Sequence, residues 1–113
     1  MITKLKPNQI FVYGSNCQGL HAGGAAKQAY EQFGAQWGIG HGLVGQTYAI
    51  DTMSGEQALL VYCNQFIDFA QHYPEYEFLL TPVGTGIACY SLERIERIFS
   101  VVPSNVIKLW EQP

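Results

Sequence analysis

The sequence predicts an α/β domain, a three-layer α/β/α sandwich with a mixed, mostly parallel sheet. Two observations predict this class. Short apolar runs of strand length alternate with segments whose apolar residues recur at helical spacing, a pattern typical of parallel sheets covered on both faces. No linker, internal repeat or low-complexity tract divides the 113 residues, a length that fits one domain. We therefore expect a single domain over residues 1–113.

The first predicted unit is a strand followed by a helix. The apolar run at 10–13 is typical of a buried strand and ends at Gly14. A loop of small residues over 14–24 leads to a helix at 25–33, and Gly34 stands where a helix C-cap belongs. Four residues of this helix are spaced to share one buried face: Ala26, Ala29, Tyr30 and Phe33.

The next segment is rich in glycine. Residues 36–45 contain four glycines, so we expect a long flexible loop without regular structure. The run at 47–50 predicts a second strand. Asp51 follows this strand and is expected to cap a turn in preference to contacting a ribose.

A second helix is predicted from Ser54 to about His72. Ser54 and Gln57 have the spacing of a capping box, which satisfies two otherwise orphan donors. Pro74 disfavours helical backbone at Tyr73 and so ends the helix. Six residues form its predicted apolar face: Leu59, Tyr62, Cys63, Phe66, Ile67 and Ala70.

The last part of the chain repeats the alternation. A third strand is predicted at 78–81, a glycine-containing loop at 82–86, a helix capped by Ser91, and a final strand at 105–110. The buried stripe of this helix is predicted to contain Leu92, Ile95, Ile98 and Phe99.

Composition excludes some classes of function. The formal net charge is −3, and the six Lys and Arg are scattered, whereas nucleic-acid binding depends on clustered cations. No apolar run has the length of a membrane span or a signal peptide. Three cysteines without C-x-x-C spacing indicate reduced thiols, so we expect a cytoplasmic protein that binds neither nucleic acid nor membrane.

The balance of charged and apolar residues bears on assembly. Charged residues make up only 13% of the chain while apolar residues make up 48%. Part of the apolar surface is therefore expected to stay exposed and to meet a ligand or another subunit. We expect a homo-oligomer.

Glycines point to a phosphate site. Gly23 and Gly24 directly precede a predicted helix, where bare N–H groups and the positive end of the helix dipole favour an anion. The loop 84–86 also follows a strand and precedes a helix. Both loops would lie at the carboxyl edge of a parallel sheet, where ligands of such folds bind. Neither has the G-x-G-x-x-G or P-loop spacing, and together they predict a phosphate-bearing ligand.

These segments resemble the macrodomain family, which binds ADP-ribose. The match covers about residues 10–100 in four segments, in the family order: Phe11-Val12-Tyr13-Gly14-Ser15-Asn16, Ala22-Gly23-Gly24-Ala25-Ala26, Gly45-Gln46-Thr47-Tyr48-Ala49-Ile50 and Thr81-Pro82-Val83-Gly84-Thr85-Gly86-Ile87-Ala88-Cys89-Tyr90. The chain is also similar to a group of short bacterial and phage proteins with a G-S-N-x-x-G-x-H segment. The resemblance implies a macrodomain-like fold and a ligand of the ADP-ribose class.

The resemblance also implies site residues. Asn16 would contact the proximal sugar, and backbone N–H groups of two loops would hold the phosphates. These loop residues are Gly23, Gly24, Ala25, Gly84, Thr85, Gly86 and Ile87. Tyr90 and Trp37 are candidates to stack on a base, and each is equally compatible with ordinary packing.

Single residues allow two interpretations each. Asn16 could be a loop residue in left-handed geometry, or it could bind a ribose hydroxyl. His21 could serve as an acid or base, although lone histidines are more often structural. For Cys17 and Cys89 we favour small buried thiols over nucleophiles, and we assign Cys63 to the core.

The leading prediction is a module that binds ADP-ribose or a related NAD-derived nucleotide. One alternative is an ADP-ribosyl hydrolase that acts through Asn16 and His21, and a further alternative is an oligomeric interaction protein without a small-molecule ligand. Binding is favoured over hydrolysis because no carboxylate lies between Asn16 and Gly24. No metal or cofactor is expected, since His21, His41 and His72 lack ligand spacing.

Overall fold

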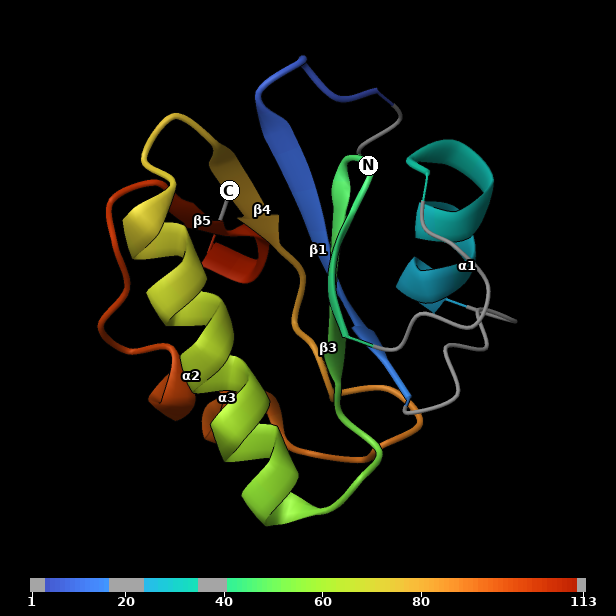
Figure 1. Ribbon diagram of the computed structural model, residues 1–113. Helices are drawn as coiled ribbons and strands as arrows, with labels where there is room; N and C mark the ends of the chain where they lie inside the picture. The colour runs from blue at the N-terminus through green and yellow to red at the C-terminus, as the bar shows by residue number, and fades with distance from the viewer. Residues whose placement is uncertain (1–3, 17–23, 35–40, 112–113) are drawn as a thin grey trace.

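Five strands form one sheet in the order β2-β3-β1-β4-β5 (Figure 1). The computed structural model describes residues 4–16, 24–34 and 41–111. In chain order the elements are β1 Gln9–Ser15, α1 Gly24–Gln32, β2 Gly42–Val44, β3 Thr47–Asp51, α2 Glu56–His72, β4 Glu77–Leu80, α3 Leu92–Ile98, β5 Val106–Lys108 and a 3-10 turn at Leu109–Glu111.

The sheet is mixed and mostly parallel. The central strand β1 is parallel to β3 on one side and to β4 on the other, and β4 is parallel to β5. Among the strands of the described residues, β2 alone runs antiparallel, against β3. The predicted α/β class and mixed sheet are therefore confirmed.

Alternate residues of β1 divide the core into two parts. Ile10 and Val12 belong to a large apolar cluster with residues of α2 and α3, whereas Phe11 and Tyr13 pack with α1. This is the two-residue period of a strand buried on both faces. Figure 1 shows the result: α1 covers one face of the sheet, and α2 and α3 cover the other.

Phe66 on α2 is the centre of the larger cluster. Its ring is fully buried and meets the rings of Tyr48, Phe78 and Phe99, with centroids 5.1, 5.5 and 6.3 Å away. Tilted and edge-on pairs of this kind add to the stabilisation from burial. The predicted apolar face of α2 is confirmed, with Leu59, Cys63, Phe66 and Ala70 buried and Tyr62 and Ile67 partly buried.

The prediction of an irregular loop over residues 36–45 is wrong for the last part of that range. Gly42–Val44 form β2, and Gly45 and Gln46 turn the chain into β3. Gly45 has a φ of +59°, and a Cβ there would lie 3.1 Å from the carbonyl oxygen of Gly34. Residues 35–40 of this expected loop, and Trp37 with them, lie outside the described residues.

The predicted capping box does not form. Helix α2 begins after Gly55, which has no side-chain cap. The hydroxyl of Ser54 donates instead to the buried carboxylate of Asp51 at 2.5 Å, because an ionised acceptor is the stronger partner. Asp51 also accepts from the N–H of Met53 at 2.9 Å, so its predicted role as a turn cap is confirmed.

Two residues of the predicted helix stripes are exposed. Tyr30 lies in the last turn of α1 and Leu92 is the first residue of α3, and both have 45% of their surface accessible. Ala29, Ile95 and Phe99 are fully buried as predicted.

The last strand is shorter than predicted. Strand β5 ends at Lys108, whose ammonium contacts Glu96 at 3.0 Å and Glu111 at 3.5 Å. The indole of Trp110 donates to the same Glu96 at 3.0 Å. These contacts accompany the 3-10 turn at Leu109–Glu111, which takes the place of the end of the predicted strand.

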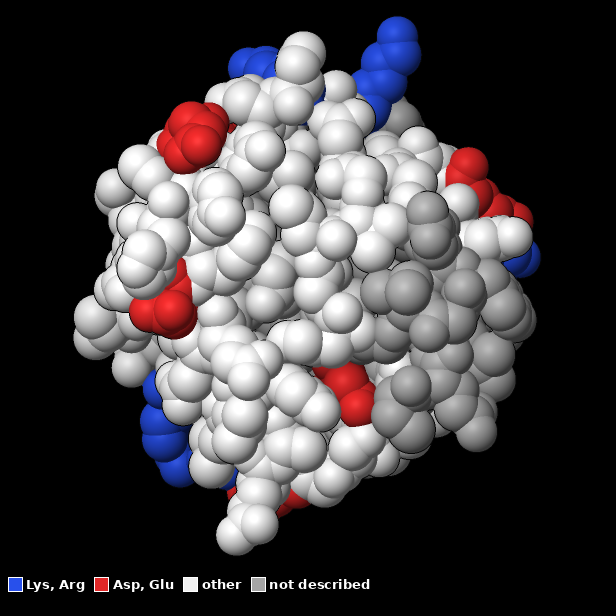
Figure 2. All heavy atoms as spheres, in the orientation of Figure 1, with Lys and Arg blue, Asp and Glu red and all other residues white. Residues whose placement is uncertain are grey.

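Charged side chains are sparse on the surface. On the face that Figure 2 shows, Lys and Arg lie near the rim and most of the area is uncharged. Among the helices of the described ranges, none has the length and apolarity needed to cross a membrane.

Asn105 generates a first prediction. Its side-chain N–H groups donate to the carbonyl oxygens of Ala70, Tyr73 and Tyr76, at 3.0, 3.1 and 3.0 Å, and so bind the end of α2 to the start of β5. Asn105→Ala should lower the free energy of unfolding by about 1–2 kcal/mol. Asn105→Asp should lower it further, because a carboxylate would face three carbonyl oxygens.

Urea denaturation measures both changes. Asn64→Ala, which alters an exposed asparagine in the middle of α2, is the matched control and should leave stability unchanged or slightly raised. If Asn105→Asp were as stable as the wild type, the three bonds would not hold this corner of the fold.

Candidate functional site

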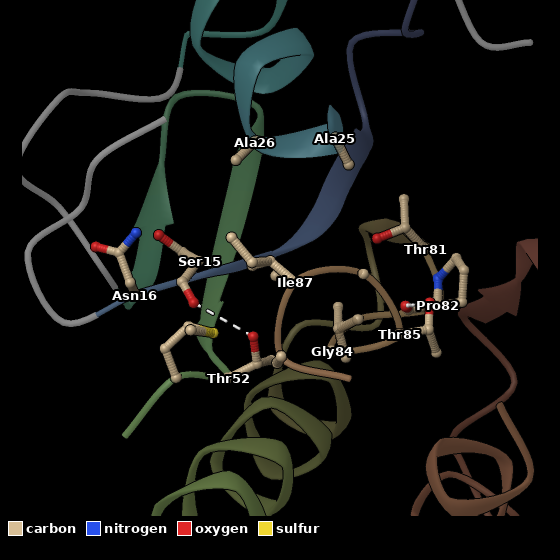
Figure 3. Close-up of a pocket in the computed structure, with 15 residues that line it drawn as sticks. Ser15, Asn16, Ala25, Ala26, Thr52, Thr81, Pro82, Gly84, Thr85 and Ile87 are labelled. Carbon is tan, nitrogen blue, oxygen red and sulfur yellow. Dashed lines mark hydrogen bonds between the residues drawn. The ribbon is translucent and has the colours of Figure 1, made fainter. Parts of the chain in front are cut away.

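A pocket of about 650 Å³ lies at the carboxyl ends of β1 and β4 (Figure 3). Four segments line it: 14–16 after β1, 25–26 on α1, 52–53 after β3, and 81–88 after β4. Its volume lies within the range of roughly 300–1,000 Å³ that is typical of sites for small molecules.

The sheet topology explains the position of the pocket. The chain that leaves β1 enters α1 on one face of the sheet, whereas the chains that leave β3 and β4 enter α2 and α3 on the other. The helices that follow β1 and β4 therefore lie on opposite faces of the sheet. In parallel sheets such a divergence opens a crevice at the carboxyl edge, where ligands bind.

Close contacts hold the loop after β4 against the end of β1. A Cβ on Gly14 would lie 3.3 Å from the amide nitrogen of Gly84, a tighter approach than most Cβ atoms make, so glycine is favoured there. Thr81 donates to the carbonyl oxygen of Val12 from both its amide, at 3.1 Å, and its hydroxyl, at 2.7 Å. The walls of the pocket are thus fixed to the central strand.

The loop after β4 folds on itself. The Thr85 hydroxyl donates to the carbonyl oxygen of Pro82 at 2.7 Å. The amide of Tyr90 donates to the carbonyl oxygen of Gly84 at 2.9 Å. Gly84 has a φ of +78°. Among the described residues, this arrangement leaves the three consecutive N–H groups of Gly86, Ile87 and Ala88 without a partner. Successive unpaired amides of this kind can bind an anion.

The N-terminus of α1 faces this loop. Ala25 and Ala26 line the pocket, and Figure 3 shows them on α1, across from the loop that carries Gly84, Thr85 and Ile87. The first N–H groups of a helix have no partner within the helix, and its dipole is positive at this end. No acidic residue in the first turn of α1 neutralises that dipole.

The structure brings six predicted ligand residues to one pocket, and Gly24 begins the helix beside them. The six that line the pocket are Asn16, Ala25, Gly84, Thr85, Gly86 and Ile87. Tyr90 is not among the lining residues: its ring packs against the larger apolar cluster and against Gly84. His21 and Gly23, and Cys17 with them, lie outside the described residues.

Sequence reasoning missed several lining residues. Ser15 and Thr52 stand at the ends of β1 and β3, and Met53 follows Thr52. The sequence rule that sites gather at the carboxyl ends of parallel strands could have included all three.

The pocket is electrically neutral in the described part of the chain. None of its described lining residues carries an ionisable side chain. Shifted pKa values occur elsewhere: burial lowers the pKa of His41 and raises that of Tyr13, Tyr48 and Cys63 to about 12. The perturbed groups that often mark a catalytic centre are therefore not among these lining residues.

The cysteines differ from expectation in one case. Cys63 is fully buried in the core as predicted, but Cys89 is exposed. It has a φ of +65°, and its thiol donates to the carbonyl oxygen of Ile87 at 3.3 Å. This sharp turn at the end of the loop carries the side chain outward. Within the described ranges, no group of three or more His, Cys, Asp and Glu could hold a metal ion.

Comparison with protein families, curated proteins and solved structures finds no match. The fold and the pocket define an α/β protein with a neutral, ligand-sized site at the carboxyl edge of its sheet.

Two glycines of the loop should respond differently to alanine. A Cβ on Gly84 would lie 3.1 Å from the ring of Tyr90, and the positive φ there disfavours any side chain. A Cβ on Gly86 would meet nothing within 4 Å. Gly84→Ala should therefore destabilise the fold by about 1–3 kcal/mol, whereas Gly86→Ala should have no such cost.

Urea denaturation of the two variants tests this directly. Equal losses of stability in both would contradict the loop geometry, because only one of the two glycines has a conformational reason to be glycine.

Proposed function

We propose that the protein binds ADP-ribose or a related NAD-derived nucleotide in this pocket. One observation carries the proposal: three consecutive N–H groups without a partner among the described residues, those of Gly86, Ile87 and Ala88, belong to a loop that lines a pocket of about 650 Å³ together with the first turn of α1. Two sets of backbone donors on opposite walls suit the two linked phosphates of a pyrophosphate.

The charge distribution supports a site built from backbone groups. The protein has a net charge of −3, and no Lys or Arg is among the described lining residues. Phosphates would therefore be held by amide dipoles and the helix terminus. A macrodomain-like use of two glycine loops, as the sequence resemblance implies, is consistent with this wall chemistry.

The remaining lining residues suit the rest of a nucleotide. Met53 and Ile87 offer apolar surface, with Ile87 87% exposed on its loop. Asn16 brings an amide side chain to the end of β1, where it would contact a ribose hydroxyl. Pockets of this class combine apolar walls with a few polar groups that orient the ligand.

The neutral lining favours binding over hydrolysis. Cleavage of an ADP-ribosyl bond needs an activated water, and a general base contributes roughly 10²- to 10⁴-fold. The described lining offers no carboxylate or imidazole. Backbone amides that stabilise substrate and transition state equally give affinity without rate.

The third alternative is an interaction protein without a small-molecule ligand. Nine large apolar side chains are exposed among the described residues, including Leu60, Val61 and Leu92 on α2 and α3. The homo-oligomer inferred from composition stays a prediction. Nucleotide released by heating the purified protein would separate this alternative from the two that require a ligand.

A first functional prediction concerns Gly86. Gly86→Val should reduce the affinity for ADP-ribose at least tenfold, because the added methyl groups would project into the pocket and meet no protein atom within 4 Å of the Cβ. Isothermal titration calorimetry measures the affinity, and circular dichroism confirms the fold.

Ile87 allows a matched control. Ile87→Ala should weaken binding about fivefold, because the ligand buries this exposed side chain. Val101→Ala alters a side chain that is 84% exposed outside the pocket and should bind like the wild type. Wild-type affinity in the folded Gly86→Val and Ile87→Ala variants would remove this pocket as the nucleotide site.

A second functional prediction concerns turnover. Mono-ADP-ribosylated substrates with Asp, Glu, Ser or Arg linkages should release no ADP-ribose beyond the background rate, because the described pocket lacks a general base. Release is followed by chromatography of the free nucleotide. Rapid release that disappears in Asn16→Ala or His21→Ala would favour the hydrolase instead.

A further inference from the structure

Ser15 is an exception among the buried polar residues. It is the last residue of β1, lines the pocket and has only 5% of its surface exposed. Its hydroxyl is shielded from solvent and has no hydrogen-bond partner among the described residues. Buried hydroxyl groups in folded proteins are almost always bonded, so an orphan of this kind requires an explanation.

The other buried polar side chains are all bonded. Four polar residues of the described chain are buried: Ser15, Thr47, Asp51 and Thr52. Thr47 donates to the carbonyl oxygen of Val44 at 2.6 Å, and Asp51 accepts from Met53 and Ser54. The Thr52 hydroxyl lies beside Ser15 but donates to its carbonyl oxygen, at 3.3 Å. Two buried side-chain atoms of the described residues lack a hydrogen-bond partner, the Ser15 hydroxyl and Nδ1 of His41, and of these two only Ser15 lines the pocket.

The backbone of Ser15 is held firmly. Its carbonyl oxygen accepts from both the amide of Thr52, at 3.0 Å, and the Thr52 hydroxyl. Strand pairing places Ser15 opposite Asp51, whose carboxylate is already engaged with other donors. Only rotation about the Cα–Cβ bond remains, and it moves the hydroxyl among three staggered positions at the wall of the pocket. Figure 3 shows Ser15 there, next to Asn16.

We propose that the Ser15 hydroxyl is a ligand contact that hydrogen-bonds an oxygen of the bound nucleotide. The inference rests on the proposed function, because it assigns the missing partner to the ligand of that pocket. A hydroxyl can donate to a phosphate oxygen or exchange a hydrogen bond with a sugar hydroxyl. The unbonded hydroxyl lowers the stability of the ligand-free protein and is available to bond the ligand.

The test is Ser15→Ala, compared with the wild type in affinity and in stability. Removal of one ligand hydrogen bond should weaken ADP-ribose binding by roughly 3- to 30-fold. The thermal midpoint of the empty protein should be unchanged or higher, because the variant removes a buried group that lacks a partner. A purely structural serine would show the opposite: lower stability and unchanged affinity.

Thr47→Val is the matched control. It removes a buried hydroxyl that has a partner and lies outside the pocket, so it should lower the thermal midpoint and leave the affinity unchanged. Inorganic pyrophosphate identifies the ligand atom. Weaker binding of both pyrophosphate and ADP-ribose to Ser15→Ala indicates a phosphate contact, and weaker binding of ADP-ribose alone indicates a sugar contact.

Two outcomes overturn the inference, and they differ from each other. If the wild type binds ADP-ribose and Ser15→Ala binds it equally well, the ligand contact is wrong while the proposed function stands. If the wild type does not bind ADP-ribose at all, the proposed function fails and the inference fails with it.

Discussion

The central strand β1 is the element on which the rest of the structure depends. Its backbone pairs with β3 on one side and β4 on the other, and its side chains are buried on both faces. Buried N–H and C=O groups must be paired, so this double pairing fixes the two neighbouring strands to one register. Alternate residues of β1 then give each helical layer its apolar partner, and the strand's carboxyl end brings Ser15 and Asn16 to the pocket.

The sequence predicted what depends on local pattern and on general rules of parallel sheets. Asn16 and Ile87 are far apart in the chain, yet both follow predicted strands, so their meeting at one edge could be expected. Strand β2 could not be predicted, because three residues that begin with Gly42 do not form an apolar run of strand length. The failure of the capping box could not be predicted either. The Ser54 hydroxyl bonds Asp51 instead of the helix, and this depends on where β3 ends in the folded chain. The place of Ser15 at the end of a strand could be expected, but its missing hydrogen-bond partner could not, because that depends on the neighbours it has in the folded chain.

A neutral pocket on an acidic protein has consequences for recognition. Attraction by Lys and Arg acts over several ångströms and weakens with salt, whereas amide dipoles act only at contact. The described walls contain amides, hydroxyls and apolar side chains. Selection of a phosphate-bearing ligand would therefore depend on shape and on the direction of donors.

The two outer strands of the sheet, β2 and β5, have three residues each. A long unpaired edge is a template on which another chain can add a strand. Here β5 passes at once into a 3-10 turn, and Lys108 is bound to Glu96 beside it. So few free backbone groups give an incoming strand little to pair with. The homo-oligomer stays a prediction, and its contacts would depend on side-chain surfaces and not on extension of the sheet.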